Sequence, residues 1–246
     1  MAVAQFYESG SGSRLAQYLS AGALAVFIVS APASLLIPFI DVEVARFFYG
    51  PDNAFARNDP AVELIRNFFK AVYIAACVGA LAGFVSCYFG RGCWFGLTAV
   101  QNLFVITCLA LGPGVVSNLV LKDNWGRARP SQIVQFGGKR TFSAALVPSQ
   151  QCKKNCSFVS GEASSIFMVF FAAAFVFPLW ARRLVLLGVA GGGAAGLIRM
   201  AQGGHFLSDV VFAGIAMALT AAFAYQLFCM MGYRELIVRH PAAHDA

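Results

Sequence analysis

The sequence contains six apolar runs separated by polar segments. A transmembrane helix needs about 20 mostly apolar residues to cross a bilayer. Apolar residues make up 59% of the 246 residues and charged residues only 12%, whereas soluble domains average about 45–50% and 25%. We therefore predict an all-α, polytopic membrane protein with six transmembrane helices. The predicted spans are residues 15–40, 64–89, 93–121, 158–180, 184–197 and 206–231.

These runs are predicted to form one membrane domain, residues 15–232. Residues 1–14 are rich in Gly and Ser and are predicted to be a mobile tail, and residues 233–246 form a polar C-terminal tail. Pro32 and Pro38 are expected to bend the first span. Residues 41–60 mix charged and aromatic side chains, which is typical of a segment at headgroup level.

The net charge of +7 comes from basic residues that lie in the loops between apolar runs. This placement favours contacts with phosphate groups or anionic lipid headgroups over nucleic acid, so the expected partners are the bilayer and a lipid substrate. Four cations of the long polar loop at residues 122–157 have no assigned role, because they could recognise a headgroup or merely solvate the loop. They are Lys139, Arg140, Lys153 and Lys154.

One histidine stands within the apolar body of the chain, because His240 and His244 belong to the C-terminal tail. If the last run is helical, His205 and Asp209 are four residues apart on one helix face. An Asp in this position can hold the imidazole in one tautomer and stabilise its cation, as enzymes do with a nucleophilic histidine. The alternative is a lone histidine that caps an apolar helix, with the aspartate as its partner.

The long loop carries polar clusters at both ends. It starts with Lys122, Arg127 and Arg129, which could form an oxyanion clamp or lie among the lipid headgroups as a snorkelling cluster. It ends at Ser160-Gly161-Glu162, where small residues at a helix start leave backbone N–H groups free for an anion. The alternative is an ordinary helix cap followed by a first-turn acid.

Taken together, the three stretches resemble the type 2 phosphatidic acid phosphatase superfamily. The matching residues, in chain order, are Lys122-(six residues)-Arg129-Pro130, Ser160-Gly161 and Arg199-(five residues)-His205-(three residues)-Asp209. The resemblance implies six spans, part of the active site on the loop between helices three and four, and attack on phosphorus by His205 oriented by Asp209. It implies no metal and no cofactor, because cations neutralise the phosphoryl charge. The implied phosphate-binding residues are Lys122, Arg129, Ser160, Gly161 and Arg199.

Two positions depart from the family pattern. The family's middle motif is Pro-Ser-Gly-His, with a histidine that protonates the leaving group, and this chain has Val159-Ser160-Gly161-Glu162. Glu162 is therefore the candidate acid, unless the leaving group needs little protonation, as with a diphosphate. The third motif usually begins Ser-Arg and here begins Ile198-Arg199.

Within the superfamily, the residues around Trp125 and Ser160 look like those of the bacterial lipid A 1-phosphatase branch. The implied substrate is the 1-phosphate of lipid A at the periplasmic face of the inner membrane. Phosphatidylglycerophosphate and undecaprenyl diphosphate are alternatives with the same chemistry. Two alternatives come from other functional classes: a lipid-binding protein without catalytic activity and a transporter. A transporter would carry ionisable residues deep within several spans, and these spans are nearly free of charge away from their ends.

The orientation is predicted from arginines and cysteines. A raw count of positive charges places the long loop in the cytoplasm, but several loop cations are better explained as site residues. Arginines mark the two shortest turns, at residues 90–92 and 182–183, and we place these turns in the cytoplasm together with both termini.

Cys152 and Cys156 could close a disulfide in an oxidising compartment, which would agree with a loop outside the cytoplasm, and free thiols are the alternative. No other Cys or His in the loop could complete a zinc site with them. The remaining cysteines are expected to pack within spans.

Overall fold

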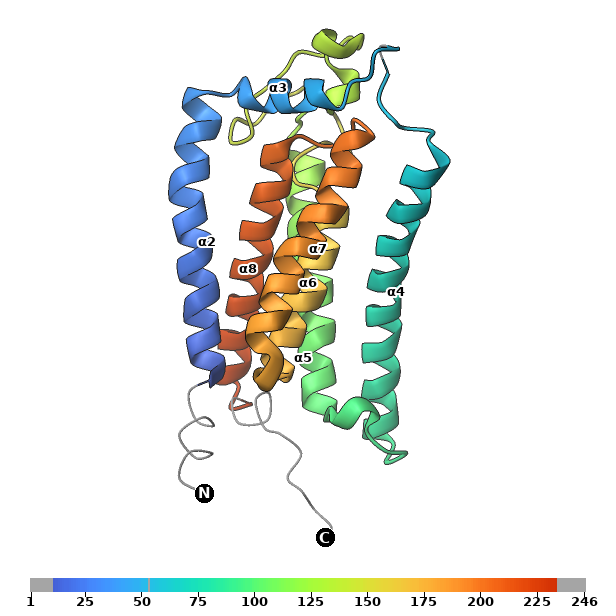
Figure 1. Ribbon diagram of the computed structural model, residues 1–246. Coiled ribbons are helices and arrows are strands. Elements are labelled where there is room, and N and C mark those ends of the chain that lie inside the picture. Colours follow the sequence, from blue (N-terminus) through green and yellow to red (C-terminus); the bar gives the residue numbers. More distant parts are fainter. Residues whose placement is uncertain (1–10, 53, 234–246) are drawn as a thin grey trace.

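The chain is all-helical in the computed structural model, which describes residues 11–52 and 54–233. Long helices run side by side as a bundle, and one short helix lies across the end of it (Figure 1). The α-helices are α2 (Ser11–Leu36), α3 (Ile40–Phe47), α4 (Pro60–Tyr88), α5 (Ala99–Leu109), α6 (Gly161–Val176), α7 (Ala181–Ala201) and α8 (Leu207–Met230). Helix α5 continues in π-helical form as η2 (Ala110–Lys122). We call the end covered by α3 the site end and the other, where α2 begins and α8 ends, the opposite end.

Each of the six predicted apolar runs contains a helix, but the number of spans is not confirmed. Among the described residues, five helical stretches are long and apolar enough to cross a membrane. The helix of the fourth run, α6, has only 16 residues, or about 24 Å at 1.5 Å per residue. It starts after the turn that ends at Ser160, and it stops at Val176 because the following Phe177 precedes Pro178.

The first part of the chain differs from the prediction at two places. Helix α2 begins at Ser11, so the predicted tail is wrong for residues 11–14, while residues 1–10 and 234–246 lie outside the described part of the chain. Pro32 lies inside α2, and Pro38 lies in the turn before α3. Asp41, which was expected at headgroup level, is buried in α3. Its carboxylate is needed in the interior to bind a buried arginine, as described below.

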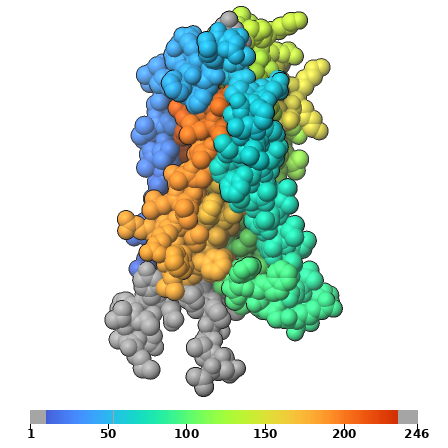
Figure 2. Space-filling model, turned by 45° about the vertical axis from the view of Figure 1, so that its right-hand side comes forward, coloured from blue at the N-terminus to red at the C-terminus, as the bar shows by residue number. Residues whose placement is uncertain are grey.

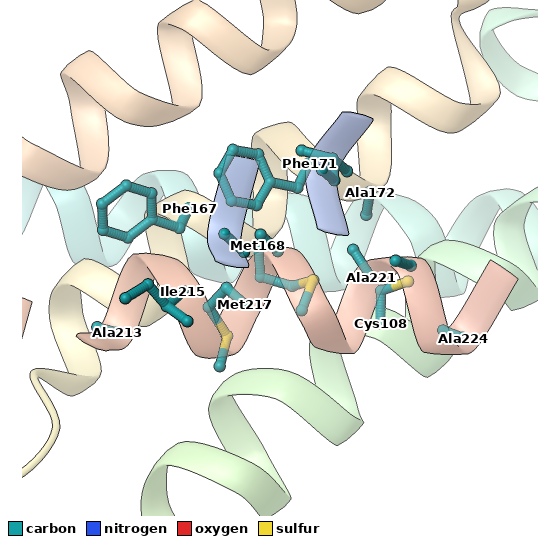
Figure 3. Packing of buried hydrophobic residues seen from close by; sticks show 14 of the residues in the cluster. Cys108, Phe167, Met168, Phe171, Ala172, Ala213, Ile215, Met217, Ala221 and Ala224 are labelled. Carbon is teal, nitrogen blue, oxygen red and sulfur yellow. The ribbon is translucent and has the colours of Figure 1, made fainter. Parts of the chain in front are cut away.

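The core lies mainly between α6 and α8. Figure 3 shows side chains of α6 lying against α8, with Phe167 and Met168 next to Ile215 and Met217. The small residues Ala172, Ala213 and Ala221 are fully buried and let these helices approach closely. Helices α2 and α7 pack outside this pair, α2 on α8 and α7 on α6.

Helix α4 is attached to the bundle mainly by its second half. Asp59 caps its start by accepting hydrogen bonds from two backbone amides. Its buried residues are Ala80, Gly83 and Ser86, and none of residues 60–79 is buried. At the site end α4 is therefore held by polar contacts rather than by packing. Figure 2 shows its first half on the surface beside α3. At the opposite end the structure pairs Cys87 with Cys93 in a disulfide, so the expectation that these two cysteines only pack within spans was wrong.

Candidate active site

The three sequence stretches meet at the site end of the bundle. Lys122 is the last residue of η2, and Arg129 follows it in the loop. Ser160 precedes α6, and Gly161 and Glu162 are its first residues. Arg199 lies in the last turn of α7. Residues 202–206 connect α7 to α8 and carry His205.

His205 is buried, with 1% of its surface exposed. Its Nδ1 donates a hydrogen bond to the carbonyl oxygen of Ser157 at 2.7 Å, which leaves Nε2 as the unprotonated nitrogen of the neutral ring. Nε2 is also buried, and no described residue forms a hydrogen bond with it. Burial lowers the pKa of His205 to about 4, although neighbouring Asp209 opposes this shift. At neutral pH the ring is therefore uncharged and its Nε2 lone pair is free.

Asp209 lies beside His205, but the two are not on one helix face. Helix α8 begins at Leu207, so His205 lies in the preceding turn. The closest approach is 3.7 Å, between Nδ1 of His205 and Oδ2 of Asp209. The expectation of a shared helix face was therefore wrong, because the backbone amide of Phe206 uses the same carboxylate oxygen as a cap, at 2.8 Å. The hydroxyl of Ser157 also donates to this oxygen, at 2.5 Å.

Arg127 completes this buried network. Its guanidinium, with a fully buried side chain, contacts Asp209 Oδ1 at 2.5 Å and Asp41 Oδ2 at 2.8 Å. Burial alone would lower the pKa of Arg127, but the two aspartates outweigh it and raise the pKa. Ser208 donates its backbone amide and its hydroxyl to Asp41. Arg127 thus ties α3 to the start of α8 and fixes Asp209 from behind.

Glu162 lies in front of His205, on the side of Nε2. Its Oε2 is 3.9 Å from Nε2. Its Oε1 lies 3.2 Å from Nε of Arg199 and 3.2 Å from Nη2 of Arg66, a residue of α4. Arg199 in turn donates to the side chain of Gln202, which donates to Glu63 of α4 at 3.0 Å. One carboxylate is thus shared by two arginines from different helices.

Three further predicted phosphate-binding residues, Ser160, Lys122 and Arg129, lie at the site end and differ in their contacts. The Ser160 amide donates to the backbone carbonyl of Asp209 at 3.1 Å, while its buried hydroxyl has no partner among the described residues. Lys122 lies against Gly161, since a Cβ added to this glycine would be 2.9 Å from the lysine Nζ. Arg129 is half-buried and donates to the carbonyl and side-chain oxygens of Asn155 at 2.9 and 3.0 Å, and its guanidinium also interacts electrostatically with Glu162.

Asn155 belongs to the short segment between Cys152 and Cys156. The structure places the two cysteines in a disulfide, with Cα atoms 5.6 Å apart. The amide of Cys156 donates to the carbonyl of Lys122, and the amide of Asn155 donates to the side chain of Asp123. This loop therefore packs against the start of the basic stretch.

The sequence did not predict the roles that four residues have in the site. Arg127 was expected in a possible oxyanion clamp and not as the partner of Asp209, and Arg66 was given no role. Asp41 was assigned to the membrane interface. Ser157 acts partly through its backbone carbonyl, for which no side-chain pattern gives a signal. A charged residue directly beside an apolar run was the available signal for Asp41.

The bundle and its basic end define a class, that of multi-pass helical membrane proteins with a buried histidine among convergent cations. A family model described as the PAP2 superfamily matches residues 102–231, more than half of the chain. The chain belongs to this superfamily. The match starts after α2, α3 and α4, so Asp41 and Arg66 lie outside it.

Three relatives are named lipid A 4'-phosphatase. The protein of Francisella tularensis subsp. novicida (strain U112) is 48% identical over 129 residues, which cover 50% of this chain and 56% of the relative. That of Rhizobium leguminosarum is 38% identical over 161 residues, covering 63% and 67%. That of Rhizobium etli (strain ATCC 51251 / DSM 11541 / JCM 21823 / NBRC 15573 / CFN 42) is 36% identical over 156 residues, covering 63% and 60%. The match thus spans little more than half to two thirds of each relative. The names specify the 4'-phosphate, which is a different branch from the 1-phosphatases. No solved structure matches the chain significantly.

Proposed function

We propose that this protein is a membrane lipid phosphatase that hydrolyses a phosphomonoester of lipid A through a phosphohistidine on His205. The observation that carries the proposal is the buried imidazole, whose Nδ1 is engaged by Ser157 and whose Nε2 is free. Such a ring is neutral, oriented and able to attack at one nitrogen. The relatives' names favour the 4'-phosphate as the bond that is cleaved.

In the proposed first step, Nε2 attacks phosphorus, the P–N bond forms and the P–O bond to the sugar breaks. Glu162, a carboxylate between two arginines, takes the proton of the monoanionic phosphomonoester and passes it to the leaving oxygen. In the second step, water attacks the phosphohistidine, the P–N bond breaks and the proton of the water goes to Glu162. Asp209, held by Arg127 and Ser157, orients the ring and stabilises its positive charge.

The phosphoryl oxygens are held by donors from three segments. They are Lys122, Arg129, Ser160, the Gly161 amide and Arg199. These cations supply the charge neutralisation that Mg²⁺ gives in other phosphoryl-transfer enzymes, so the proposed reaction needs no metal. Both hydrogen bonds of Arg129 to Asn155 use Nη2, so the phosphate is proposed to bind its other guanidinium N–H groups.

The proposed catalytic unit is residues 15–232, because the site uses contacts from α3 and α4 as well as from the family-matched segment. We propose that six helices cross the inner membrane, that the site faces the periplasm and that the termini are cytoplasmic.

The test is phosphate release by the detergent-purified protein, with His205→Gln as the blank and EDTA present throughout. The substrates are lipid A, phosphatidylglycerophosphate, phosphatidic acid and undecaprenyl diphosphate. Mass spectrometry of lipid A after the reaction shows which phosphate was lost. We expect loss of the 4'-phosphate only, with no release by the variant.

Each other outcome changes a defined part of the proposal. Loss of the 1-phosphate would mean that the protein acts like the lipid A 1-phosphatases, which its motifs resemble. Release from a different lipid would keep the chemistry and discard the substrate. Release by His205→Gln would remove the phosphohistidine, and no release from any lipid would favour a catalytically inactive lipid-phosphate-binding protein.

A further inference from the structure

Glu162 lies where the phosphoryl group has to be. Attack by Nε2 needs phosphorus at about 3–3.5 Å, and Oε2 of Glu162 is 3.9 Å from this nitrogen. The carboxylate side chain is only 18% exposed. It contacts Arg199, which is among the residues proposed to hold the phosphate. A phosphoryl group and this carboxylate cannot occupy the same position, and their negative charges repel each other.

Arg66 already holds one oxygen of this carboxylate and can keep it when phosphate binds Arg199. Its Nε and Nη2 lie 3.3 and 3.2 Å from Oε1 of Glu162, and its Nη1 donates to both oxygens of Glu63 at 3.1 Å. The Arg66 side chain is 25% exposed and the Arg199 side chain only 9%. Solvent therefore reaches the site mainly from the side of Arg66 and α4, and Glu162 lies between that side and His205.

Helix α4 can follow such a movement at small cost in packing. None of its residues before Ala80 is buried, and the apolar residues of this part that pack on the core, Tyr73, Ala76 and Cys77, lie below Arg66 in the helix. Polar contacts here join Arg66 to Glu162 of α6 and Glu63 to Gln202, the residue that follows α7.

We propose that the carboxylate of Glu162 occupies the phosphate position in the free protein and that Arg66 alone keeps it when a phosphate group displaces it from Arg199 and His205. Arg66 is thus a positioning residue that acts through Glu162. In-line displacement puts the leaving oxygen on the side of phosphorus away from Nε2, and this is the side to which Glu162 is displaced. The exchange brings the carboxylate next to the oxygen that must be protonated.

The inference rests on the proposed phosphate site, but its test needs no turnover. Binding of inorganic phosphate to the detergent-purified full chain is measured by calorimetric titration. We expect Glu162→Ala to bind phosphate at least about tenfold more tightly than the unaltered protein, because a competing anion is gone. Glu162→Gln, which keeps the side-chain volume, should change affinity in the same direction. Equal or weaker binding by both variants would overturn the proposal, as would absence of phosphate binding in both.

A double-mutant cycle tests Arg66. Arg66→Met should weaken phosphate binding about tenfold in the unaltered protein and less than about twofold in the Glu162→Ala background, and Arg66→Lys should restore much of the affinity. A loss of the same size in both backgrounds would mean that Arg66 attracts phosphate directly and would overturn its assigned role. The matched controls are Glu43→Gln and Arg46→Met, an ion pair on α3 that is 60% and 59% exposed. If phosphate binding behaves as expected but no lipid is hydrolysed, the proposed function fails and this inference stands.

Discussion

Arg127 and Arg129 are two residues apart and have opposite surroundings. Arg127 has a fully buried side chain between two buried aspartates, and its guanidinium lies 4.3 Å from the centre of the Phe206 ring. Arg129 is partly exposed and contacts Asn155. The family motif includes Arg129 and passes over Arg127, although only Arg127 contacts Asp209. The first residue therefore has a structural role that positions the site, and the second is available to a ligand.

The two arginines should separate stability from activity. Arg127→Met leaves Asp41 and Asp209 buried without their cation, so we expect the free energy of unfolding to fall by about 3–5 kcal/mol. Arg129→Met should leave this free energy nearly unchanged and lower kcat/KM by about 100-fold, the effect of removing one donor to a developing charge. Unfolding in detergent and phosphate release measure the two effects. A stable Arg127→Met protein would show that the buried network is dispensable.

Side-chain chemistry at this scale was partly predictable. The resemblance to the superfamily implied one site for His205, Asp209 and Arg199, and the structure brings them together around Glu162. The ring's direct hydrogen bond goes to the Ser157 carbonyl, and the aspartate's first contacts are an amide, a hydroxyl and Arg127. Backbone acceptors and partners from distant segments leave no spacing pattern in one sequence, so these contacts could not be predicted.

At the scale of elements, glycines set how closely α7 approaches its neighbours. Helix α7 is rich in glycine, and its backbone is in close contact with neighbouring side chains at three positions. A Cβ added to Gly188, Gly192 or Gly196 would meet side-chain atoms of Phe171, Phe167 or Val210 at 3.0 Å or less. At Gly193 nothing lies within 4 Å. The high glycine content of α7 indicates tight packing of this helix, but only its orientation in the structure shows which glycines lie at the contacts.

The adjacent residues Gly192 and Gly193 form a matched pair. Gly192→Ala places a methyl group 2.6 Å from the Phe167 ring, and such overpacking should lower the free energy of unfolding by about 1–3 kcal/mol. Gly193→Ala meets open space and should stabilise the helix by about 0.5–1 kcal/mol. Thermal unfolding of the two variants in one detergent compares them directly. Equal effects would mean that α7 does not pack on α6 in this register.

For the whole molecule, the six apolar runs predicted the bundle, and its ends carry different chemistry. The site end has the basic cluster and the pair Cys152–Cys156, and the opposite end has the pair Cys87–Cys93. Disulfides persist in oxidising compartments and are reduced in the cytoplasm. If the site faces the periplasm, Cys152 and Cys156 should therefore stay oxidised and Cys87 and Cys93 should be reduced. This orientation depends on whether the short helix α6 crosses the membrane. If it does, the turn before α7 lies on the same side of the membrane as the turn before α5.

Single cysteines can show whether α6 crosses the membrane. The positions are Lys139, Arg91 and Arg182, all exposed, placed in a background in which the seven native cysteines are replaced and phosphate binding is retained. A membrane-impermeant maleimide should label Lys139→Cys in intact spheroplasts, and Arg91→Cys and Arg182→Cys only after lysis. Labelling of Arg182→Cys together with Lys139→Cys would mean that α6 turns back within the bundle, which gives five spans. Labelling of Lys139→Cys only after lysis would put the site in the cytoplasm, where the lipid would have to be dephosphorylated before it crosses the membrane.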